Sequence, residues 1–268
     1  MAETIRDQAA GLRHLLARER LRVLPLAAGH SGAGKTTLIL GIACALAAAG
    51  RRVAVLDVGS GEVAAALSLT WRWELAHLLE GVREYREVAL AGPADGIEIV
   101  PSAKGVAALV AAGRGGEELF GAFARLGTRP DLLLFDIPAK STGVCALLPQ
   151  EAEIAIVMRP GREALTATYS CLKALVRRQG RRRFRLVVNG APQAEAQQLH
   201  RHMAEVVRRF LDAELGWGGA VAAEPVLRAG GARAALACAG AFEALAASLS
   251  DWRLAEYRVP EPAGRAHR

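Results

Sequence analysis

The sequence has little of what marks several common classes of protein. Its four cysteines are scattered and its six histidines form no cluster, so we expect buried thiols in a reducing cytosol rather than a metal site or disulfides. No uninterrupted apolar run reaches the roughly 18 residues of a membrane-spanning helix. The first residues also lack a basic segment followed by an apolar one, so we expect no export signal and a cytoplasmic protein.

Lysine is scarce as well. Four of the 34 basic residues are lysines, and arginine supplies the rest of the positive charge behind a net +7. Alanine and glycine are abundant too, and this composition is typical of a protein encoded by a GC-rich genome. We therefore do not take the net positive charge as a sign of nucleic-acid binding, and we expect no nucleic-acid partner. The densest basic run covers residues 177–185. We predict a solvated loop there, with contact to anionic lipid, nucleic acid or an acidic partner as the alternative.

Residues 29–37 fit the template of a phosphate-binding loop, which is Gly, four residues and Gly-Lys-Thr. An apolar strand is predicted before it at 23–28, and a helix after it at 38–49. The N-terminus of such a helix favours anions. Because both flanks agree with the motif, we predict that the chain binds ATP together with Mg²⁺.

Each residue type in the loop has a chemical reason. Gly29, Gly32 and Gly34 let the backbone curl so that its N–H groups point at phosphate oxygens. Lys35 adds a positive charge at the β- and γ-phosphates, and the Thr36 hydroxyl is a magnesium ligand. The other residues predicted to line the nucleotide are His30, Ser31, Ala33 and Thr37.

Strands alternate with helices through the rest of the chain, and each strand is apolar throughout. This pattern predicts a single α/β domain of the P-loop NTPase fold, with a mostly parallel, twisted sheet covered by helices on both faces. The further predicted strands are 51–57, 97–102, 130–136, 153–158 and 185–189, and the predicted helices are near 163–178, 193–214 and 240–256.

Two of these strands end on a carboxylate. Asp136 closes an apolar run in the Walker B pattern, so we predict that it holds magnesium together with Thr36. Asp57 ends a neighbouring strand, at the edge where open α/β sheets place their ligand residues. We name Lys35 and Asp57 as candidate catalytic residues.

The order of motifs resembles the MinD/ParA class of deviant-Walker ATPases over most of residues 22–257. The resemblance implies that Asn189 reads the adenine edge and that a loop at Glu224 and Pro225 lies near the base. It also implies a possible ATP-dependent homodimer. Beyond the domain, residues 258–268 are expected to form a disordered tail.

A segment ahead of the domain indicates a branch of this class. Residues 1–21 are predicted to hold an amphipathic helix, with Ile5, Ala9, Leu12 and Leu16 on one face. The stretch is similar to a signature of the FlhG (FleN) family, which controls flagellar number. The resemblance implies that the helix activates an FlhF-like GTPase of the signal-recognition-particle type. The residues assigned to this role are Asp7, Gln8, Leu12 and Arg13.

Several positions depart from the class. His30 replaces a signature lysine that reaches into the partner subunit, and a short imidazole cannot replace that permanent cation. Gly59 replaces a carboxylate that positions the attacking water. Lys140 replaces a switch glycine, and Ala167 replaces an aspartate. Together these changes predict weak or absent hydrolysis by a nucleotide-binding regulator.

Two alternatives remain open from the sequence. The chain could instead be an active, ATP-cycling positioning ATPase, like the MinD homologues of cellulose synthesis or pilus location. Near the C-terminus, Phe242, Leu245, Leu249 and Trp252 form one apolar face. We predict the last core helix of the domain there, with a lipid-binding helix at the inner face of the membrane as the alternative.

Overall fold

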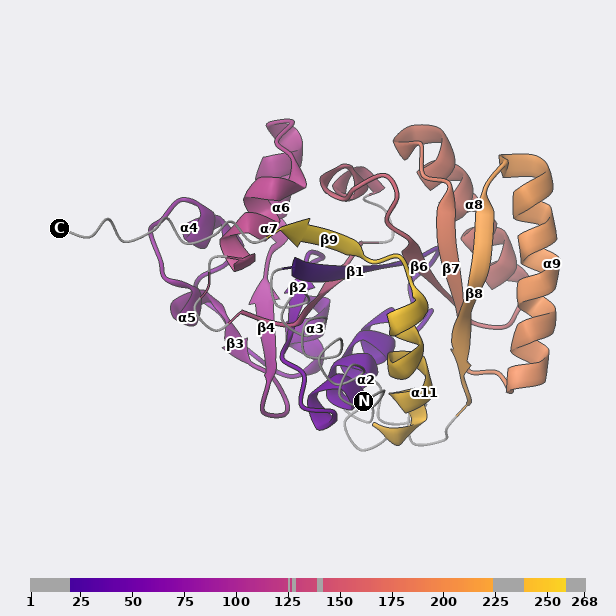
Figure 1. Cartoon of the computed structure of the whole chain (residues 1–268), viewed down its shortest axis with the longest axis horizontal. Coiled ribbons are helices and arrows are strands. Elements are labelled where there is room, and N and C mark those ends of the chain that lie inside the picture. Colours follow the sequence, from indigo (N-terminus) through magenta and orange to yellow (C-terminus); the bar gives the residue numbers. More distant parts are fainter. Residues whose placement is uncertain (1–19, 125, 127–128, 139–141, 224–238, 259–268) are drawn as a thin grey trace, which may run out of the picture.

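The computed structural model describes residues 20–124, 126, 129–138, 142–223 and 239–258 (Figure 1). The predicted partner-activating residues near the N-terminus lie outside this part of the chain, and so do Glu224 and Pro225. Strand β1 begins at Arg20, ahead of residue 22, where the domain is predicted to start.

Within the described residues, one nine-stranded sheet organises the chain. Its order is β3-β4-β2-β5-β1-β6-β7-β8, and β9 pairs with the start of β1. Neighbouring strands from β4 to β8 are parallel, whereas β3 and β9 run antiparallel to their partners. The strands are β1 (Arg20–Ala28), β2 (Val53–Asp57), β3 (Leu90–Ala91), β4 (Ile97–Pro101), β5 (Leu132–Asp136), β6 (Ile154–Met158), β7 (Arg183–Asn189), β8 (Glu214–Val221) and β9 (Ala255–Arg258).

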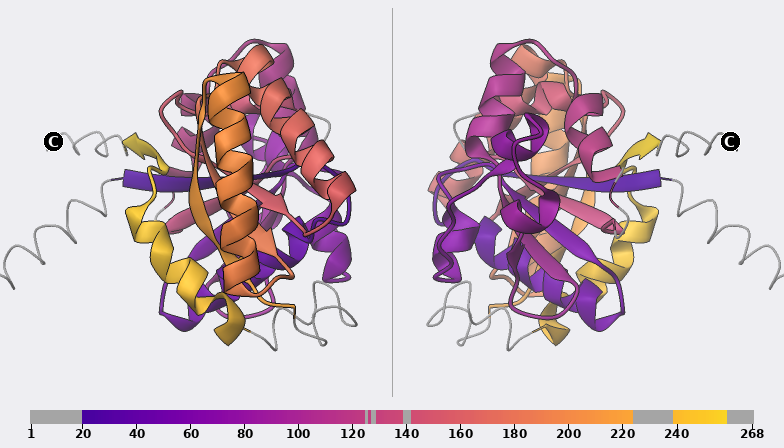
Figure 2. Two further views of the ribbon diagram at one scale, coloured as in Figure 1. Left: turned by 90° about the vertical axis from the view of Figure 1, so that its right-hand side faces the viewer. Right: turned by 90° about the vertical axis from the view of Figure 1, so that its left-hand side faces the viewer.

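Helices cover both faces of the sheet, which confirms the predicted α/β architecture (Figure 2). One face carries α2 (Lys35–Ala48), α3 (Glu62–Ala66) and α11 (Gly240–Ser248). The other carries the 3₁₀ segment η1 (Thr142–Leu147), α4 (Leu75–Leu79), α5 (Tyr85–Val88), α6 (Ala103–Ala111), α7 (Gly116–Ala124), α8 (Arg162–Gln179) and α9 (Gln193–Leu211).

The central strands are apolar at every position because both of their faces are buried. In β5, Leu133 and Phe135 face the cluster under α6 to α9, while Leu132 and Leu134 face the cluster under α2 and α11. Successive side chains of a strand point to opposite faces, so a strand between two helical layers needs no polar positions. The central strands can therefore be predicted from the sequence as uninterrupted runs of apolar residues.

The C-terminal segment differs from the single helix predicted for 240–256. Helix α11 ends at Ser248, a 3₁₀ turn η2 (Leu249–Asp251) follows, and the chain then forms β9. The four residues of the predicted apolar face are each at most 6% exposed. The predicted burial of this face in the core is therefore confirmed, although the predicted helix ends before Leu249.

Strand β8 lies where the sequence predicts the end of a helix at 214. Helix α9 stops at Leu211, and Asp212 takes a positive φ of 49° that turns the chain back along β7. Glycines fill three positions of β8, which weakens its strand pattern. Strand β8 forms because it pairs in parallel with β7, with one irregularity in register, although its local sequence does not predict a strand.

The arginine-rich run is not the solvated loop that we predict from sequence. Arg177 and Arg178 belong to the last turn of α8, and Arg183 begins β7. Arg181 is only 1% exposed, and its guanidinium donates hydrogen bonds to the carbonyls of Cys145, Leu148 and Pro149. The prediction was wrong because arginines that are adjacent in sequence differ in burial: Arg177 and Arg178 are exposed, whereas Arg181 is buried.

Candidate functional site

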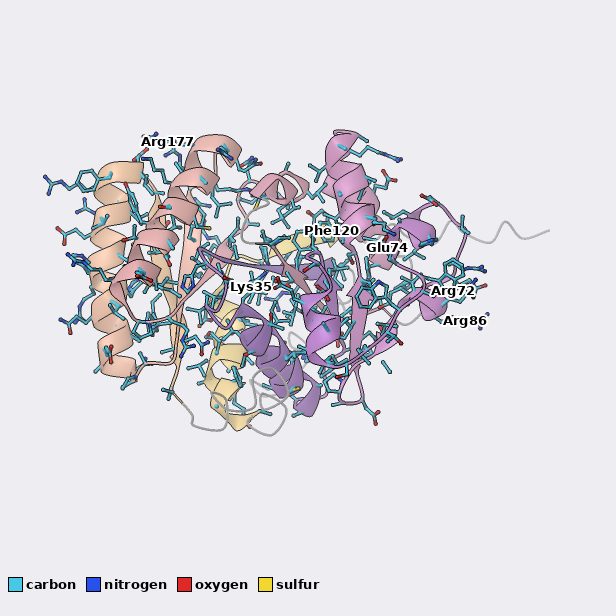
Figure 3. All side chains as sticks on the ribbon, turned by 180° about the vertical axis from the view of Figure 1, so that it is seen from behind. Lys35, Arg72, Glu74, Arg86, Phe120 and Arg177 are labelled. Carbon is cyan, nitrogen blue, oxygen red and sulfur yellow. The ribbon has the colours of Figure 1, made fainter. Side chains whose placement is uncertain are left out.

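The phosphate loop connects β1 to α2 at the carboxyl ends of the central parallel strands (Figure 3). Gly34 is the N-cap of α2, with a positive φ of 82°. Within the described residues, no side chain caps this helix, and its first turn holds no acidic residue. The N–H groups at its start and the positive end of its dipole therefore favour an anion.

At two positions of the loop a side chain would not fit, because other backbone or side-chain groups approach the glycine closely. A Cβ at Gly29 would lie 2.5 Å from the backbone carbonyl of Ala167 in α8. A Cβ at Gly34 would collide with the amide of Asn189. That amide donates a hydrogen bond to the carbonyl of Ala33, 3.1 Å away. Asn189 therefore touches the loop directly, and its predicted contact with adenine stays a prediction.

Lys35 and Asp136 form a buried ion pair beside the loop. The Nζ of Lys35 donates to Oδ1 of Asp136 and, over 2.7 Å, to the carbonyl of Ile137. Burial raises the pKa of Asp136, and the charge of Lys35 opposes that rise. The other carboxylate oxygen, Oδ2, is buried and has no hydrogen-bond partner among the described residues.

Asp57 lies beside Asp136 because β2 and β5 pair in parallel with these two residues in register. Its Oδ2 accepts hydrogen bonds of 3.0 Å from the backbone N–H groups of Val63 and Ala64, which begin α3. Burial raises the pKa of Asp57 to about 6 against the pull of these bonds, and the charge of Asp136 adds to the rise. Its Oδ1 is buried and lacks a partner in the described part of the chain.

These residues fit a magnesium nucleotide. Thr36 and Thr37 lie in the first turn of α2, directly after Lys35, which is paired with Asp136. Asp136 and its neighbour Asp57 each keep one buried oxygen without a hydrogen-bond partner among the described residues. The described residues contain no group of three or more histidine, cysteine or acidic side chains that could hold a metal ion alone. Magnesium is commonly held by one or two carboxylates and by the phosphates of its nucleotide.

His30 does not extend from the loop as a free cation would. Its Nδ1 lies 2.7 Å from the carbonyl of Ser31, the next residue. Its Nε2 is buried and has no partner within the described residues. Ser31 and Gly32 are exposed at the tip of the loop, whereas Ala33 is buried. Lys140 lies outside the described residues.

Glu62 is a residue of this site that sequence reasoning missed. Its carboxyl carbon lies 4.0 Å from the place that a Cβ would occupy on Gly59. Its negative charge raises the pKa values of both Asp57 and Asp136. The sequence offered one signal that could have identified Glu62, which is that it is the only acidic residue between Asp57 and Glu74.

Comparisons with known proteins agree with this geometry. The family model of the CobQ/CobB/MinD/ParA nucleotide-binding domain matches residues 24–226. The antiactivator FleN of Pseudomonas aeruginosa is 34% identical over 207 residues, which are 75% of this chain and 73% of that protein.

Solved structures share the fold at lower identity. The MinD cell division protein of Aquifex aeolicus is similar with a TM-score of 0.62 and 20% identity, over 86% of this chain and 97% of that one. MinD of Pyrococcus horikoshii, solved with Mg-ADP, has a TM-score of 0.59 and 20% identity over 85% and 96% of the two chains.

In the part of the chain that the structure describes, every helix is too short or too polar to span a membrane.

Proposed function

Because the chain belongs to the CobQ/CobB/MinD/ParA nucleotide-binding family, in the branch of the antiactivator FleN, we propose that it is an ATP-binding regulator of flagellar number and placement. The observation that carries the proposal is the uncapped start of α2 next to Lys35 and two buried carboxylates with unused oxygens. This arrangement supplies positive charge for phosphates and ligands for magnesium at one edge of the sheet.

Nucleotide binding in this site is an exchange of partners. Lys35 would contact the β- and γ-phosphates in place of Asp136. Asp136 and Thr36 would hold magnesium, which would neutralise phosphate charge. The N–H groups of residues 32–37 would hold the phosphate oxygens. Lys35 and Asp136 would each keep a partner of opposite sign, so the exchange would avoid leaving either of them as a lone buried ion.

We propose that hydrolysis and ATP-driven dimerisation are weak. His30 is folded back onto Ser31 and is too short to cross an interface as a lysine does. Gly59 offers no side chain to orient water. Losing a contact of this kind commonly lowers a rate by about 10²–10³-fold. The alternative, an active positioning ATPase of the MinD class, requires a turnover at saturating ATP that equals that of ordinary MinD-class enzymes.

Calorimetry of Mg-ATP binding tests the nucleotide site. Lys35→Ala should weaken binding at least about tenfold, because a charge-assisted contact to phosphate is lost. Lys104→Ala is the matched control, since the Lys104 ammonium is exposed and pairs with Glu74 instead. Wild-type protein that binds no Mg-ATP, or a Lys35→Ala variant that binds as tightly as wild type, would refute the proposal.

We propose that the N-terminal segment is the output of the regulator. Residues 5–16 would dock their apolar stripe in a groove of an FlhF-like GTPase, as helix-in-groove partners do. Gln8 would orient the attacking water in that GTPase, as a glutamine does in other GTPases. Asp7 and Arg13 would fix the register through charged hydrogen bonds. The motif match to the FlhG family supports this role.

A GTPase assay with a peptide of residues 1–20 tests the segment separately. The peptide should raise the hydrolysis rate of the cognate GTPase, and Gln8→Ala should abolish the increase. Full-length Lys35→Ala protein should still stimulate, because the segment contains none of the residues assigned to the nucleotide site. A basal rate in the presence of the peptide would show that the segment has another role.

A further inference from the structure

Three carboxylates lie near one another at the carboxyl edge of the sheet, and they differ in exposure. Asp57 and Asp136 are each 1% exposed, whereas Glu62 is exposed at the start of α3. Glu62 stands over Gly59, with its carboxyl carbon 4.0 Å from where a Cβ on that glycine would be. No ion pair or hydrogen bond involves its side chain within the described residues. Its side chain is exposed to solvent at this edge.

The two buried carboxylates already have other tasks. Asp136 is paired with Lys35 and is the expected magnesium ligand. Asp57 is fixed by two backbone N–H groups, because its Oδ2 holds the start of α3 in place. A group that both orients a water from the solvent side and accepts its proton has to reach solvent and has to be a base. Among the described residues of this edge, Glu62 meets both conditions.

We propose that Glu62 orients the attacking water in the residual ATP hydrolysis of this chain, as a carboxylate supplied from α3 in place of the side chain that Gly59 lacks. In this step the water oxygen forms a bond to the γ-phosphorus, and the bond from that phosphorus to the β–γ bridging oxygen breaks. The bond's electron pair leaves with ADP. Glu62 accepts the proton of the water and returns it to the phosphate product.

This inference depends on the proposed nucleotide site, so its test measures binding and turnover separately. Glu62→Gln keeps the size of the side chain and removes its charge. We expect kcat for ATP to fall by about 10²-fold, with the affinity for Mg-ATP within about twofold of wild type. Glu205→Gln in α9 is the control, because it removes an exposed carboxylate far along the chain from the loop.

A second readout does not depend on turnover. Mg-ADP with aluminium fluoride imitates the γ-phosphoryl group during hydrolysis, and calorimetry measures its binding. Wild type should bind this combination more tightly than Mg-ADP alone, and Glu62→Gln should lose most of the difference. Gly59→Asp placed in a Glu62→Ala background should restore turnover in part, because nothing nearer than 4.0 Å obstructs a Cβ there.

The outcomes separate the two proposals. Equal kcat values for Glu62→Gln and wild type overturn the role of Glu62, and so does a loss of Mg-ATP affinity as large as the loss of turnover. Wild type that binds Mg-ATP but hydrolyses none of it also overturns this inference, while the nucleotide-binding regulator stands. Wild type that binds no Mg-ATP overturns both.

Discussion

Lys35 donates a hydrogen bond to Asp136, so the cation of the phosphate loop is paired with the carboxylate that is expected to hold magnesium. The two residues are 101 positions apart in sequence and come together because β1 and β5 are neighbours in the sheet. Both side chains are nearly inaccessible to solvent. Removing either partner would therefore leave the other charge buried and unpaired in the nucleotide-free domain.

Breaking this pair should destabilise the domain. Lys35→Met leaves the charge of Asp136 buried without a partner, and we expect the free energy of unfolding at pH 8 to fall by about 3 kcal/mol. The loss should shrink toward acidic pH, because Asp136 then takes up a proton. Urea unfolding without nucleotide measures it. The double variant Lys35→Met with Asp136→Asn should recover most of the loss, and simple addition of the two single effects would contradict the pairing.

The sequence was sufficient to predict the central strands and the residues that gather at their carboxyl ends. The loop glycines and Lys35 form a contiguous motif, and Asp57 and Asp136 end strands that are apolar at every position. Such strands can be predicted from sequence because a strand that is buried on both faces is a continuous apolar run, without the alternating polar residues of a half-exposed strand. Parallel strands then bring their carboxyl ends to one edge, whatever their separation in sequence.

The elements that sequence reasoning missed depend on distant contacts. Strand β9 is only four residues long and exists because it pairs with the first residues of β1. Arg181 is a charged residue in a basic run, and only the carbonyls of the segment after β5 make its burial favourable. Glu62 lies over Gly59 because Asp57 fixes the first turn of α3. Neither periodicity nor composition encodes these relationships.

Asp57 should make stability depend on pH. Its pKa is raised from 3.8 to about 6 in the folded protein, so the folded state binds more protons than the unfolded state between those values. Stability from this group therefore decreases as pH rises from about 4 to about 6. Asp57→Asn should remove that decrease, with a gain on the order of 1–3 kcal/mol at pH 8 that vanishes near pH 4.

Urea unfolding of the nucleotide-free protein at several pH values measures this effect, with the exposed Asp95→Asn as the control. A variant Asp57→Asn that is less stable than wild type at pH 8 would contradict the prediction. That result would mean that the bonds to Val63 and Ala64 need a full negative charge.

Arg181 should be worth far more to stability than its neighbours in the basic run. Arg181→Met leaves three carbonyls, including those of Cys145 and Pro149, without their donor in a buried place. We expect a loss of about 3 kcal/mol in the free energy of unfolding. Arg178→Met, at an exposed position of the same run, should change it by less than about 0.5 kcal/mol. Equal effects of the two variants would show that the buried guanidinium is not what holds this segment.

The packing of α11 on α2 gives the last prediction. A Cβ on Gly41 of α2 would lie 2.5 Å from the ring of Phe242 in α11. Alanine is normally preferred to glycine inside a helix by about 1 kcal/mol. Here we expect Gly41→Ala to destabilise the domain by about 1–3 kcal/mol, because the added methyl group overfills a close-packed contact.

Thermal and urea unfolding measure this effect, and a second substitution identifies its cause. Phe242→Leu removes ring volume and should itself destabilise the domain by leaving a cavity. In the Phe242→Leu background, however, Gly41→Ala should be much less harmful, since the added methyl group occupies the vacated space. If Gly41→Ala is neutral in wild type, or equally harmful in both backgrounds, then α11 does not pack on α2 through this contact. Its apolar face would then again be open to the lipid-binding interpretation that its burial now argues against.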